Sequence, residues 1–252
     1  MNPSLWFCVP AHGRHRLTGI CLRQLRRTCD QLEREGVTAT AVIVADDENL
    51  GFAKDLGFAT VERPNDYLGR KFNDAIQLAC DSRHNPWPAD YVVPCGSDDW
   101  VDHRLFLDLP ARNTMLGFPW LSIVREDGRE ISTRFISTRG GCGIRIYPRQ
   151  LMEPLGYRPA DEDRKRACDT SIYTNLVRHH GDTMRVFHNH MHEHGIVDWK
   201  SPDEQLNSYK SLQIYRADST ADPFEALAGT YPAVALEEMR AHYAAQRELV
   251  AA

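Results

Sequence analysis

The chain has 252 residues and a formal net charge of -5, with 42% hydrophobic and 26% charged residues. This composition is that of an ordinary soluble globular protein, long enough to bury a sizeable core. The acidic balance argues against nucleic acid as a partner, because nucleic-acid-binding domains usually carry a basic excess, but it does not exclude a modified base as a bound group.

Cysteine usage indicates a reduced, cytoplasmic chain. The seven cysteines are odd in number and form no C-x-x-C pair, so no disulfide framework is expected. The apolar run near the N-terminus is too short for a signal peptide, and its basic residues follow that run instead of preceding it. No stretch approaches the ~18 apolar residues of a membrane span, so none is expected.

The first hundred residues alternate between predicted strands and helices. Apolar runs predict strands, and apolar residues at three- and four-residue steps predict helices between them. In chain order these are strand 4–11, a helix from Leu17 to Leu32 that ends before Gly36, strand 38–45, helix 49–57, strand 58–63, a helix after Asn65 or Asp66, and strand 89–95. Such alternation indicates βαβ units and an α/β fold with a mixed, mostly parallel sheet flanked by helices.

Polar residues follow three of the predicted strands at the point where each strand ends. They are His12 and Arg14, then Asp46 and Asp47, then Asp98 and Asp99. Ligands of parallel sheets bind beyond the carboxyl ends of the strands, so these residues predict a binding site along one rim.

The second half has a different pattern. We expect two strands within 116–138 around a turn at 126–128, a glycine-rich bend at 139–147, a helix over 161–181, a strand over 183–195, and helices over 201–210 and 231–249. The last helix is a candidate packing or homo-oligomer element. We therefore expect one main domain over 1–216, with halves 1–105 and 106–216, and a helical tail over 217–252.

Asp98 and Asp99 form the first candidate site. Paired carboxylates at a strand end suit a hard divalent cation such as Mn²⁺ or Mg²⁺. The alternative is a turn or a helix cap for the residues near 103–107, since Ser97-Asp98-Asp99 is also good capping chemistry. The position after the fourth strand favours the metal site.

Histidines form the second candidate site. His188, His190 and His192 are spaced by two, so on a strand they share one face, and His194 follows. One of them could complete the metal sphere of the aspartates. A separate zinc site and a solvated polar face are the alternatives.

The carboxylates near residue 165 are the third group. Asp161, Glu162 and Asp163 suit the first turn of a helix, where acidic residues complement the helix dipole. Asp169 lies beside apolar residues and is harder to explain in this way. A single carboxylate facing a cleft could serve as a general base.

Basic residues near the predicted rim are the fourth group. Arg14, Arg16, Arg70 and Lys71 could bind a diphosphate, or could be part of a solvated face. The chain has no Walker loop, G-x-S-x-G elbow, H-E-x-x-H or G-x-G-x-x-G, which argues against a Rossmann dehydrogenase and a P-loop NTPase.

Four segments, in their order along the chain, resemble the nucleotide-sugar half of GT-A glycosyltransferases, closest to family 2. They are "WFCVPAHGR", "AVIVADDEN", "LGRKFNDAI" and "YVVPCGSDDW". The resemblance covers residues 4–105 well and 106–200 loosely. It implies that donor-binding positions include Pro10 and Ala11 at the base, Asp46 and Asp47, Arg14, Arg70, Lys71 and Ser97. It also implies that Asp98, with Asp99 beside it, takes the metal place of the D-x-D motif.

The chain departs from that motif at one position. Gly96 stands where the first aspartate of D-x-D is expected, so the usual carboxylate contact to the ribose is in doubt. By the resemblance, Asp169 is the acceptor base, with Asp163 as second choice, and His190 or His192 completes the metal shell.

These observations predict a metal-dependent, inverting glycosyltransferase that uses Mn²⁺ or Mg²⁺, a nucleotide-sugar donor with UDP as the default, and an unidentified hydroxyl acceptor. A nucleotidyltransferase with a similar sheet and a non-catalytic metal- or nucleotide-binding protein are the alternatives. The nucleotidyltransferase normally has a loop rich in glycine after its first strand, whereas "PAHGRHR" has one glycine.

Overall fold

The computed structural model describes residues 2–46, 48–135, 143–189, 193–201 and 222–251. Its strands are β1 (Ser4–Pro10), β2 (Thr38–Ala45), β3 (Ala59–Glu62), β4 (Tyr91–Pro94), β5 (Asp99–Val101), β6 (Thr114–Gly117), β7 (Trp120–Val124), β8 (Ile131–Phe135), β9 (Arg145–Pro148), β10 (Arg185–His188) and β11 (Ile196–Trp199). Its helices are α1 (His15–Arg34), α2 (Asn49–Asp55), α3 (Leu68–Cys80), α4 (Arg149–Met152), α5 (Cys168–His180), α7 (Pro223–Ala226) and α8 (Ala233–Ala251), with short 3₁₀ turns such as η1 (His103–Phe106).

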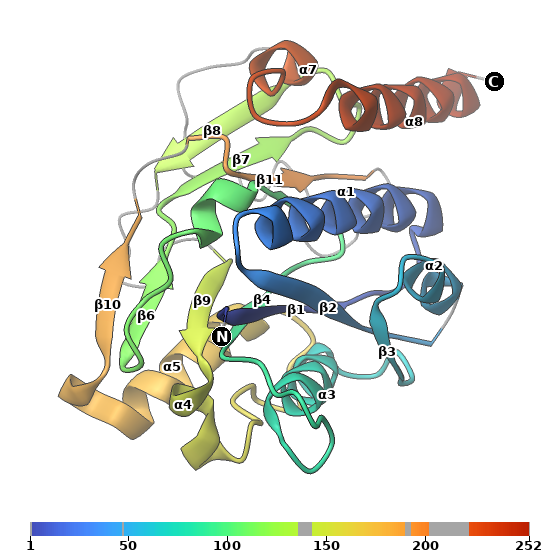
Figure 1. Cartoon of the computed structure of the whole chain (residues 1–252). Helices are drawn as coiled ribbons and strands as arrows, with labels where there is room; N and C mark the ends of the chain where they lie inside the picture. The colour runs from blue at the N-terminus through green and yellow to red at the C-terminus, as the bar shows by residue number, and fades with distance from the viewer. Residues whose placement is uncertain (1, 47, 136–142, 190–192, 202–221, 252) are drawn as a thin grey trace.

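Seven strands form the main sheet, in the order β10-β6-β9-β4-β1-β2-β3 (Figure 1). The first four strands of the chain run parallel to one another, as the alternating pattern predicts. β9 is the antiparallel member, paired with β4 and β6. The protein is therefore α/β with a mixed, mostly parallel sheet, and the carboxyl ends of β1, β2 and β4 lie along one edge.

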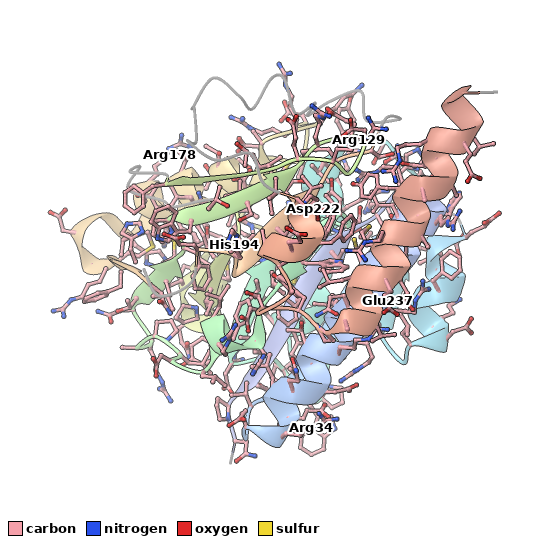
Figure 2. All side chains as sticks on the ribbon, turned by 90° about the horizontal axis from the view of Figure 1, so that it is seen from above. Arg34, Arg129, Arg178, His194, Asp222 and Glu237 are labelled. Carbon is pink, nitrogen blue, oxygen red and sulfur yellow. The ribbon has the colours of Figure 1, made fainter. Side chains whose placement is uncertain are left out.

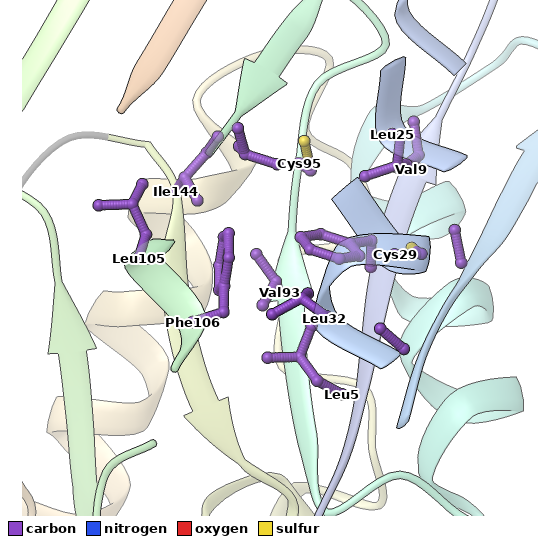
Figure 3. Close-up of a cluster of buried hydrophobic side chains, with 14 of the residues drawn as sticks. Leu5, Val9, Leu25, Cys29, Leu32, Val93, Cys95, Leu105, Phe106 and Ile144 are labelled. Atoms are coloured by element: carbon purple, nitrogen blue, oxygen red, sulfur yellow. The ribbon is translucent and has the colours of Figure 1, made fainter. Parts of the chain in front are cut away.

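The two faces of the main sheet are covered by different helices because side chains alternate along each strand. Leu5 and Phe7 of β1 face α1, where Leu25, Cys29 and Leu32 pack against them (Figure 3). The next residue, Cys8, faces the opposite way and joins a second apolar cluster that contains residues of α3 and α5. β1 and β2 are thus buried on both sides, which places their ends rigidly.

A second sheet of four strands, in the order β5-β11-β7-β8, lies on the other side of α1. Trp100 of β5 and Trp199 of β11 contact each other, with ring centroids 4.8 Å apart, and share a buried cluster with residues of α1 and α8. The predicted hairpin within 116–138 is present as β7 and β8, which pair antiparallel.

The C-terminal helix packs closely against the rest of the protein. Met239 and Tyr243 of α8 are buried in the cluster beneath the second sheet, whereas Glu237 lies on the outer face of the helix (Figure 2). Glu238 forms ion pairs of 3.5 Å with Arg23 and Arg27 of α1.

The boundaries proposed at residues 105 and 216 stay predictions. No helix of the described residues is long and apolar enough to cross a membrane.

The helix predicted over 161–181 begins later than expected. α5 starts at Cys168, and residues 161–167 are a turn region that is tied to other parts of the chain. The Asp161 carboxylate accepts from the Asn175 side chain at 2.8 Å and from Arg164 at 2.8 Å, so it serves a loop and not a helix N-terminus. The expected helix over 201–210 lies outside the described residues.

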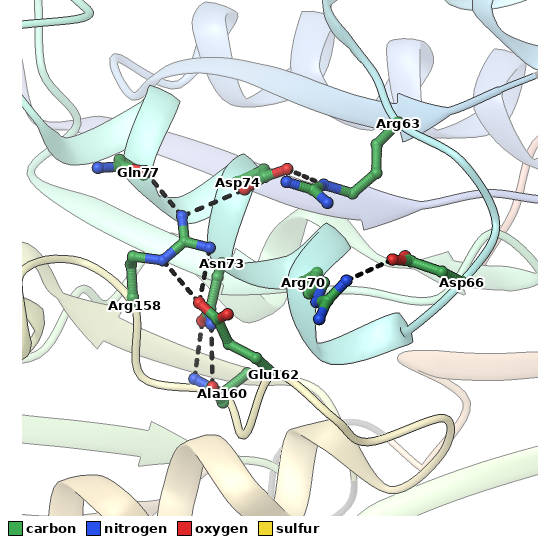
Figure 4. Close-up of polar contacts among 9 residues, drawn as sticks. All are labelled: Arg63, Asp66, Arg70, Asn73, Asp74, Gln77, Arg158, Ala160 and Glu162. Carbon is green, nitrogen blue, oxygen red and sulfur yellow. Dashed lines mark hydrogen bonds and ion pairs between the residues drawn. The ribbon is translucent and has the colours of Figure 1, made fainter.

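A polar network holds this loop against α3 (Figure 4). The Asn73 side chain exchanges two hydrogen bonds with the backbone of Ala160, at 2.8 and 2.9 Å. The Arg158 guanidinium donates to Gln77 at 2.8 Å and to Glu162 at 2.8 Å. This network fixes the segment that leads to α5 and to Asp169.

Gly69 lies at a close approach between α3 and the loop, and Gly69→Ala is expected to destabilise the protein. A Cβ there would lie 1.9 Å from the Asp161 carbonyl oxygen, which is backbone and cannot rotate away. We expect a loss of about 3 kcal/mol, as for a strongly overpacked site. The measurement is the free energy of unfolding in urea.

Gly51→Ala on α2 is the matched control, because a Cβ at Gly51 meets nothing within 4 Å. It should stabilise the helix by ~0.5–1 kcal/mol. Equal stability of the two variants would contradict the close approach at Gly69.

Candidate functional site

The site begins where β1 ends. Gly13 and Arg14 both have left-handed backbone conformations, with φ of 57° and 45°, and Asn49 of α2 donates a hydrogen bond of 3.1 Å to the Gly13 carbonyl. This turn directs the Arg14 side chain to the end of β4. Its guanidinium donates to Asp98 Oδ2 at 2.9 Å and to Ser97 Oγ at 3.3 Å. The structure therefore brings together two residues predicted from the rim pattern, Arg14 and Asp98, with Ser97, which the resemblance implied.

The turn between β4 and β5 shapes the acidic pair. The Gly96 N–H donates to Asp99 Oδ2 at 2.7 Å, and the Trp199 N–H donates to the Asp98 carbonyl at 3.0 Å. Asp99 pairs in register with Asp198 of β11, on the antiparallel neighbour of β5. A third aspartate thus reaches the site from a segment about a hundred residues later in the chain.

Asp98, Asp99 and Asp198 form a group of three carboxylates whose ligand atoms all lie within 4.8 Å of one another. Asp98 and Asp198 are largely buried, with side chains 13% and 15% exposed. The Lys200 ammonium, 2% exposed, lies 2.7 Å from Asp198 Oδ2 and 4.0 Å from Asp98 Oδ2. Two cations of the chain, Arg14 and Lys200, thus lie against three carboxylates.

The carboxylates differ in their proton affinity. Burial opposes ionisation of Asp98, but the Arg14 guanidinium and then the Lys200 ammonium hold its pKa below the usual range. Burial raises the pKa of Asp99 well above its usual range, and the charges of Asp198 and Asp98 raise it further. Burial also raises the pKa of Asp198, against the opposing charge of Lys200. The three carboxylates therefore outnumber the two neighbouring cations, Arg14 and Lys200.

These residues fit a hard divalent cation. Carboxylate oxygens are the ligands that Mn²⁺ and Mg²⁺ prefer. Asp198 Oδ1 is buried and has no hydrogen-bond partner among the described residues, which is costly unless an ion or water satisfies it. The three aspartates therefore provide a place for the Mn²⁺ or Mg²⁺ expected from the sequence.

Asp198 and Lys200 are absent from the residues that the sequence pattern identified. The expected strand over 183–195 is instead β10, ending at His188, and a separate β11 begins at Ile196. A signal was present in "IVDWK", where apolar residues surround Asp198 and Lys200 at a spacing of two, which puts both on one face of a strand. Its pairing with β5 is not visible in the sequence.

Asp46 forms a second polar group at the end of β2. Its carboxylate accepts from the Asn65 N–H at 2.9 Å and lies 3.3 Å from His12 Nδ1. Desolvation opposes ionisation, but these two contacts and the charge of Lys71 keep the pKa of Asp46 low. Asp46 therefore fastens the loop before α3 to the rim. Asp47 lies outside the described residues.

Lys71 and Arg70 have separate surroundings although they are neighbours in sequence. Lys71 is 2% exposed and donates to the Ala11 carbonyl at 2.9 Å, just beyond Pro10. Arg70 forms an ion pair of 2.7 Å with Asp66, at the surface. Lys71 thus supports the backbone after β1, whereas Arg70 pairs with Asp66 just before α3.

Asp169 lies in the first turn of α5, apart from the three clustered aspartates. Its carboxylate is about one-third exposed, at 32%, and lies 3.6 Å from Arg145 Nη1. The same guanidinium donates to the Asp169 carbonyl at 3.1 Å. Asp163 is exposed in the turn before α5.

The histidine prediction can be followed only in part, because His190 and His192 lie outside the described residues. His188 ends β10, beside Gly117 of β6. His194 Nδ1 lies 3.0 Å from Ser122 Oγ and 3.3 Å from Thr133 Oγ1, and desolvation lowers its pKa. His194, labelled in Figure 2, thus contacts β7 and β8 of the second sheet and does not belong to the acidic group.

No protein-family model and no curated protein match this chain. Similar solved structures include a mutant of Drosophila β-1,4-galactosyltransferase 7 with manganese, UDP-Gal and xylobiose, at 13% identity and TM-score 0.49, covering 87% of this chain and 82% of that one. Glucosyl-3-phosphoglycerate synthase from Mycobacterium tuberculosis with Mn²⁺, UDP and phosphoglyceric acid has 11% identity and TM-score 0.48, covering 84% and 73%.

A 4-diphosphocytidyl-2C-methyl-D-erythritol synthase from Anaerococcus prevotii has 11% identity and TM-score 0.43, covering 75% and 90%. Glycosyltransferases are thus among the structures similar to this chain, as the motif order led us to expect, and so is a nucleotidyltransferase.

Proposed function

We propose that this protein is a metal-dependent glycosyltransferase that moves a sugar from a nucleoside-diphosphate sugar, with UDP as the default nucleotide, to a hydroxyl acceptor with inversion. The observation that carries the proposal is the group formed by Asp98, Asp99 and Asp198 with Arg14 at the carboxyl edge of a parallel sheet. Ligands bind at this edge in open α/β sheets.

Asp98, Asp99 and Asp198 would hold Mn²⁺ or Mg²⁺, in place of the full D-x-D motif. Such an ion supplies positive charge that offsets the charge developing on a leaving diphosphate. Arg14 keeps Asp98 ionised and oriented, and together with Ser97 it lines the side of the site next to the start of α1. His190 or His192 stays a proposed further ligand.

The base and ribose would lie over the ends of β1 and β2. Pro10 and Ala11 form the floor, and Lys71 supports it through the Ala11 carbonyl. Asp46 presents a carboxylate there, and Arg70 would line the entrance. Asp47 stays a proposed donor-binding residue. We place the nucleotide here because these groups share the rim with Asp98.

Asp169 would remove the proton from the acceptor hydroxyl. Its carboxylate is partly exposed and lies 3.6 Å from Arg145 Nη1, so it is open to a bound alcohol and can accept a proton from it. Asp163 is the second choice, since it also precedes the core of α5.

Asp169→Asn is the test of this role. We expect turnover of sugar transfer to fall by about 10²–10⁴-fold, the usual contribution of a general base, while Mn²⁺-dependent donor binding is kept. Steady-state kinetics and donor titration measure the two quantities. Asp163→Asn is the matched variant, and a larger loss in Asp163→Asn would move the assignment to that residue.

The proposed function itself is tested by calorimetry with Mn²⁺ and a panel of nucleoside diphosphates. Tight binding of one of them only with Mn²⁺ present is the expected result. Binding of a nucleoside triphosphate with release of pyrophosphate would favour the nucleotidyltransferase. Lack of metal-dependent binding to every nucleotide in the panel would leave the non-catalytic binding protein.

A further inference from the structure

Lys200 is a buried lysine at the acidic group. It follows β11 directly, and its side chain is only 2% exposed. Lysine is rarely buried unless its ammonium is paired, because removing the charge from water is costly. Here the ammonium lies 2.7 Å from Asp198 Oδ2 and 4.0 Å from Asp98 Oδ2. At this burial the ammonium is part of the site's framework and not a mobile surface charge.

Each carboxylate of the group is held through the same oxygen, Oδ2. Asp98 Oδ2 accepts from Arg14, Asp99 Oδ2 accepts from the Gly96 N–H, and Asp198 Oδ2 accepts from Lys200. Asp198 Oδ1 is left buried without a hydrogen-bond partner among the described residues. Donors on one oxygen orient the other oxygen, which is how supporting residues arrange metal ligands.

The backbone of Lys200 is itself fixed from two sides. Its N–H donates to the Val124 carbonyl of β7 at 3.2 Å, and its carbonyl accepts from the Tyr243 hydroxyl of α8. Tyr243 is fully buried in the cluster beneath the second sheet. The ammonium is thus placed by the second sheet and by the C-terminal helix.

We propose that Lys200 is a positioning residue for the metal ion, an inference that rests on the metal site of the proposed function. Lys200 holds Asp198 so that Oδ1 faces the ion, and it offsets the repulsion among three close carboxylates before the ion binds. The competing role is that of a built-in cation that occupies the ion's place. The two roles predict opposite signs for metal affinity once the lysine is removed.

The experiment measures binding of Mn²⁺ alone, without nucleotide, from the paramagnetic resonance signal of the free ion. Lys200→Met is expected to lower Mn²⁺ affinity by ~10–100-fold, the usual cost of losing a residue that orients a metal ligand. Lys200→Gln is also neutral but keeps an N–H donor for Asp198, so it should retain more affinity than Lys200→Met. Lys54→Met removes the same charge from an exposed position on α2 and should leave Mn²⁺ affinity unchanged.

The outcomes separate the roles. Equal or tighter Mn²⁺ binding in Lys200→Met and Lys200→Gln overturns the positioning role and favours the competing cation. If thermal unfolding shows that Lys200→Met does not fold, the Mn²⁺ affinity of Lys200→Gln is compared with that of the unmodified protein. Lower affinity then supports the positioning role, and equal or tighter binding overturns it. Absence of Mn²⁺ binding in the unmodified protein overturns both this inference and the metal site, whereas loss of the Lys200 effect alone leaves the proposed function standing.

Discussion

Asp198→Asn is expected to lower Mn²⁺ affinity by more than the ~10–100-fold that a supporting residue contributes, because it would remove a proposed ligand itself. Asp198 is the only one of the three clustered aspartates that comes from β11, and its Oδ1 is buried without a partner among the described residues. An amide of the same size keeps the packing but removes the negative charge. The Mn²⁺ titration described for Lys200 measures the loss, and Mn²⁺-dependent hydrolysis of the donor should fall with it.

Asp55→Asn provides the control, since Asp55 is an exposed aspartate at the end of α2. It changes the net charge equally and should leave Mn²⁺ binding unaltered. Asp98→Ala should abolish Mn²⁺-dependent donor hydrolysis in the same assay. If Asp198→Asn kept full Mn²⁺ affinity, the ion would bind through Asp98 and Asp99 without Asp198 of β11.

Gly96→Asp, which would restore the D-x-D motif, is expected to damage the site instead of improving it. A Cβ at Gly96 would lie 2.6 Å from Asp99 Oδ2 and 2.8 Å from Asp98 Oδ1, so both carboxylates would have to move. The new carboxylate would also add a fourth acidic group beside Asp98, Asp99 and Asp198, whose negative charges already repel one another. We expect Mn²⁺ affinity to fall by ~10–100-fold, as measured by the same titration.

Gly96→Ala separates the steric cause from the electrostatic one, because it adds the Cβ alone. It should fold with a stability loss of about 1 kcal/mol or less, since the displaced atoms are the ends of side chains, and yet bind Mn²⁺ more weakly than the unmodified protein. Gly51→Asp, at an open position on α2, controls for the added charge. Tighter Mn²⁺ binding by Gly96→Asp would show that the aspartate of the usual motif is simply missing here.

The glycine at position 96 illustrates how a departure from a motif can be explained by its surroundings. The D-x-D pattern would place an aspartate at this position, and the chain has none there. In the structure, the Gly96 N–H holds Asp99 Oδ2 at 2.7 Å, and Asp198 adds a third carboxylate to Asp98 and Asp99 from another strand. We infer that β11 supplies the carboxylate that the motif lacks.

Local patterns in the sequence were sufficient for the parallel half of the fold. β1, β2 and β4 are short apolar runs that end in polar residues, and α1 has a regular apolar stripe. The spacing of the apolar residues and the polar residues at the ends therefore predict the type and the position of each element. The meeting of Arg14 with Ser97 and Asp98 follows from the same pattern, because parallel strands end at one edge.

Long-range pairing decided what local patterns could not. The acidic turn region before α5 has the composition of a helix start, but Gly69 and Asn73 of α3 bind it and hold it as a loop. β11 is four residues long, and only its pairing with β5 and β7 makes it a strand. Competing local preferences differ by less free energy than such tertiary contacts provide.

The α/β class, the rim on which polar groups gather and the acidic pair at its centre can all be predicted from the sequence. These properties depend on residue type and period, which are local. The meeting of Asp198 and Lys200 with Asp98 and Asp99 is seen only in the folded protein, because it results from the register between β5 and β11 and from the support of α8. A contact between residues about a hundred positions apart depends on how the sheets pack, and no local pattern in either segment encodes it.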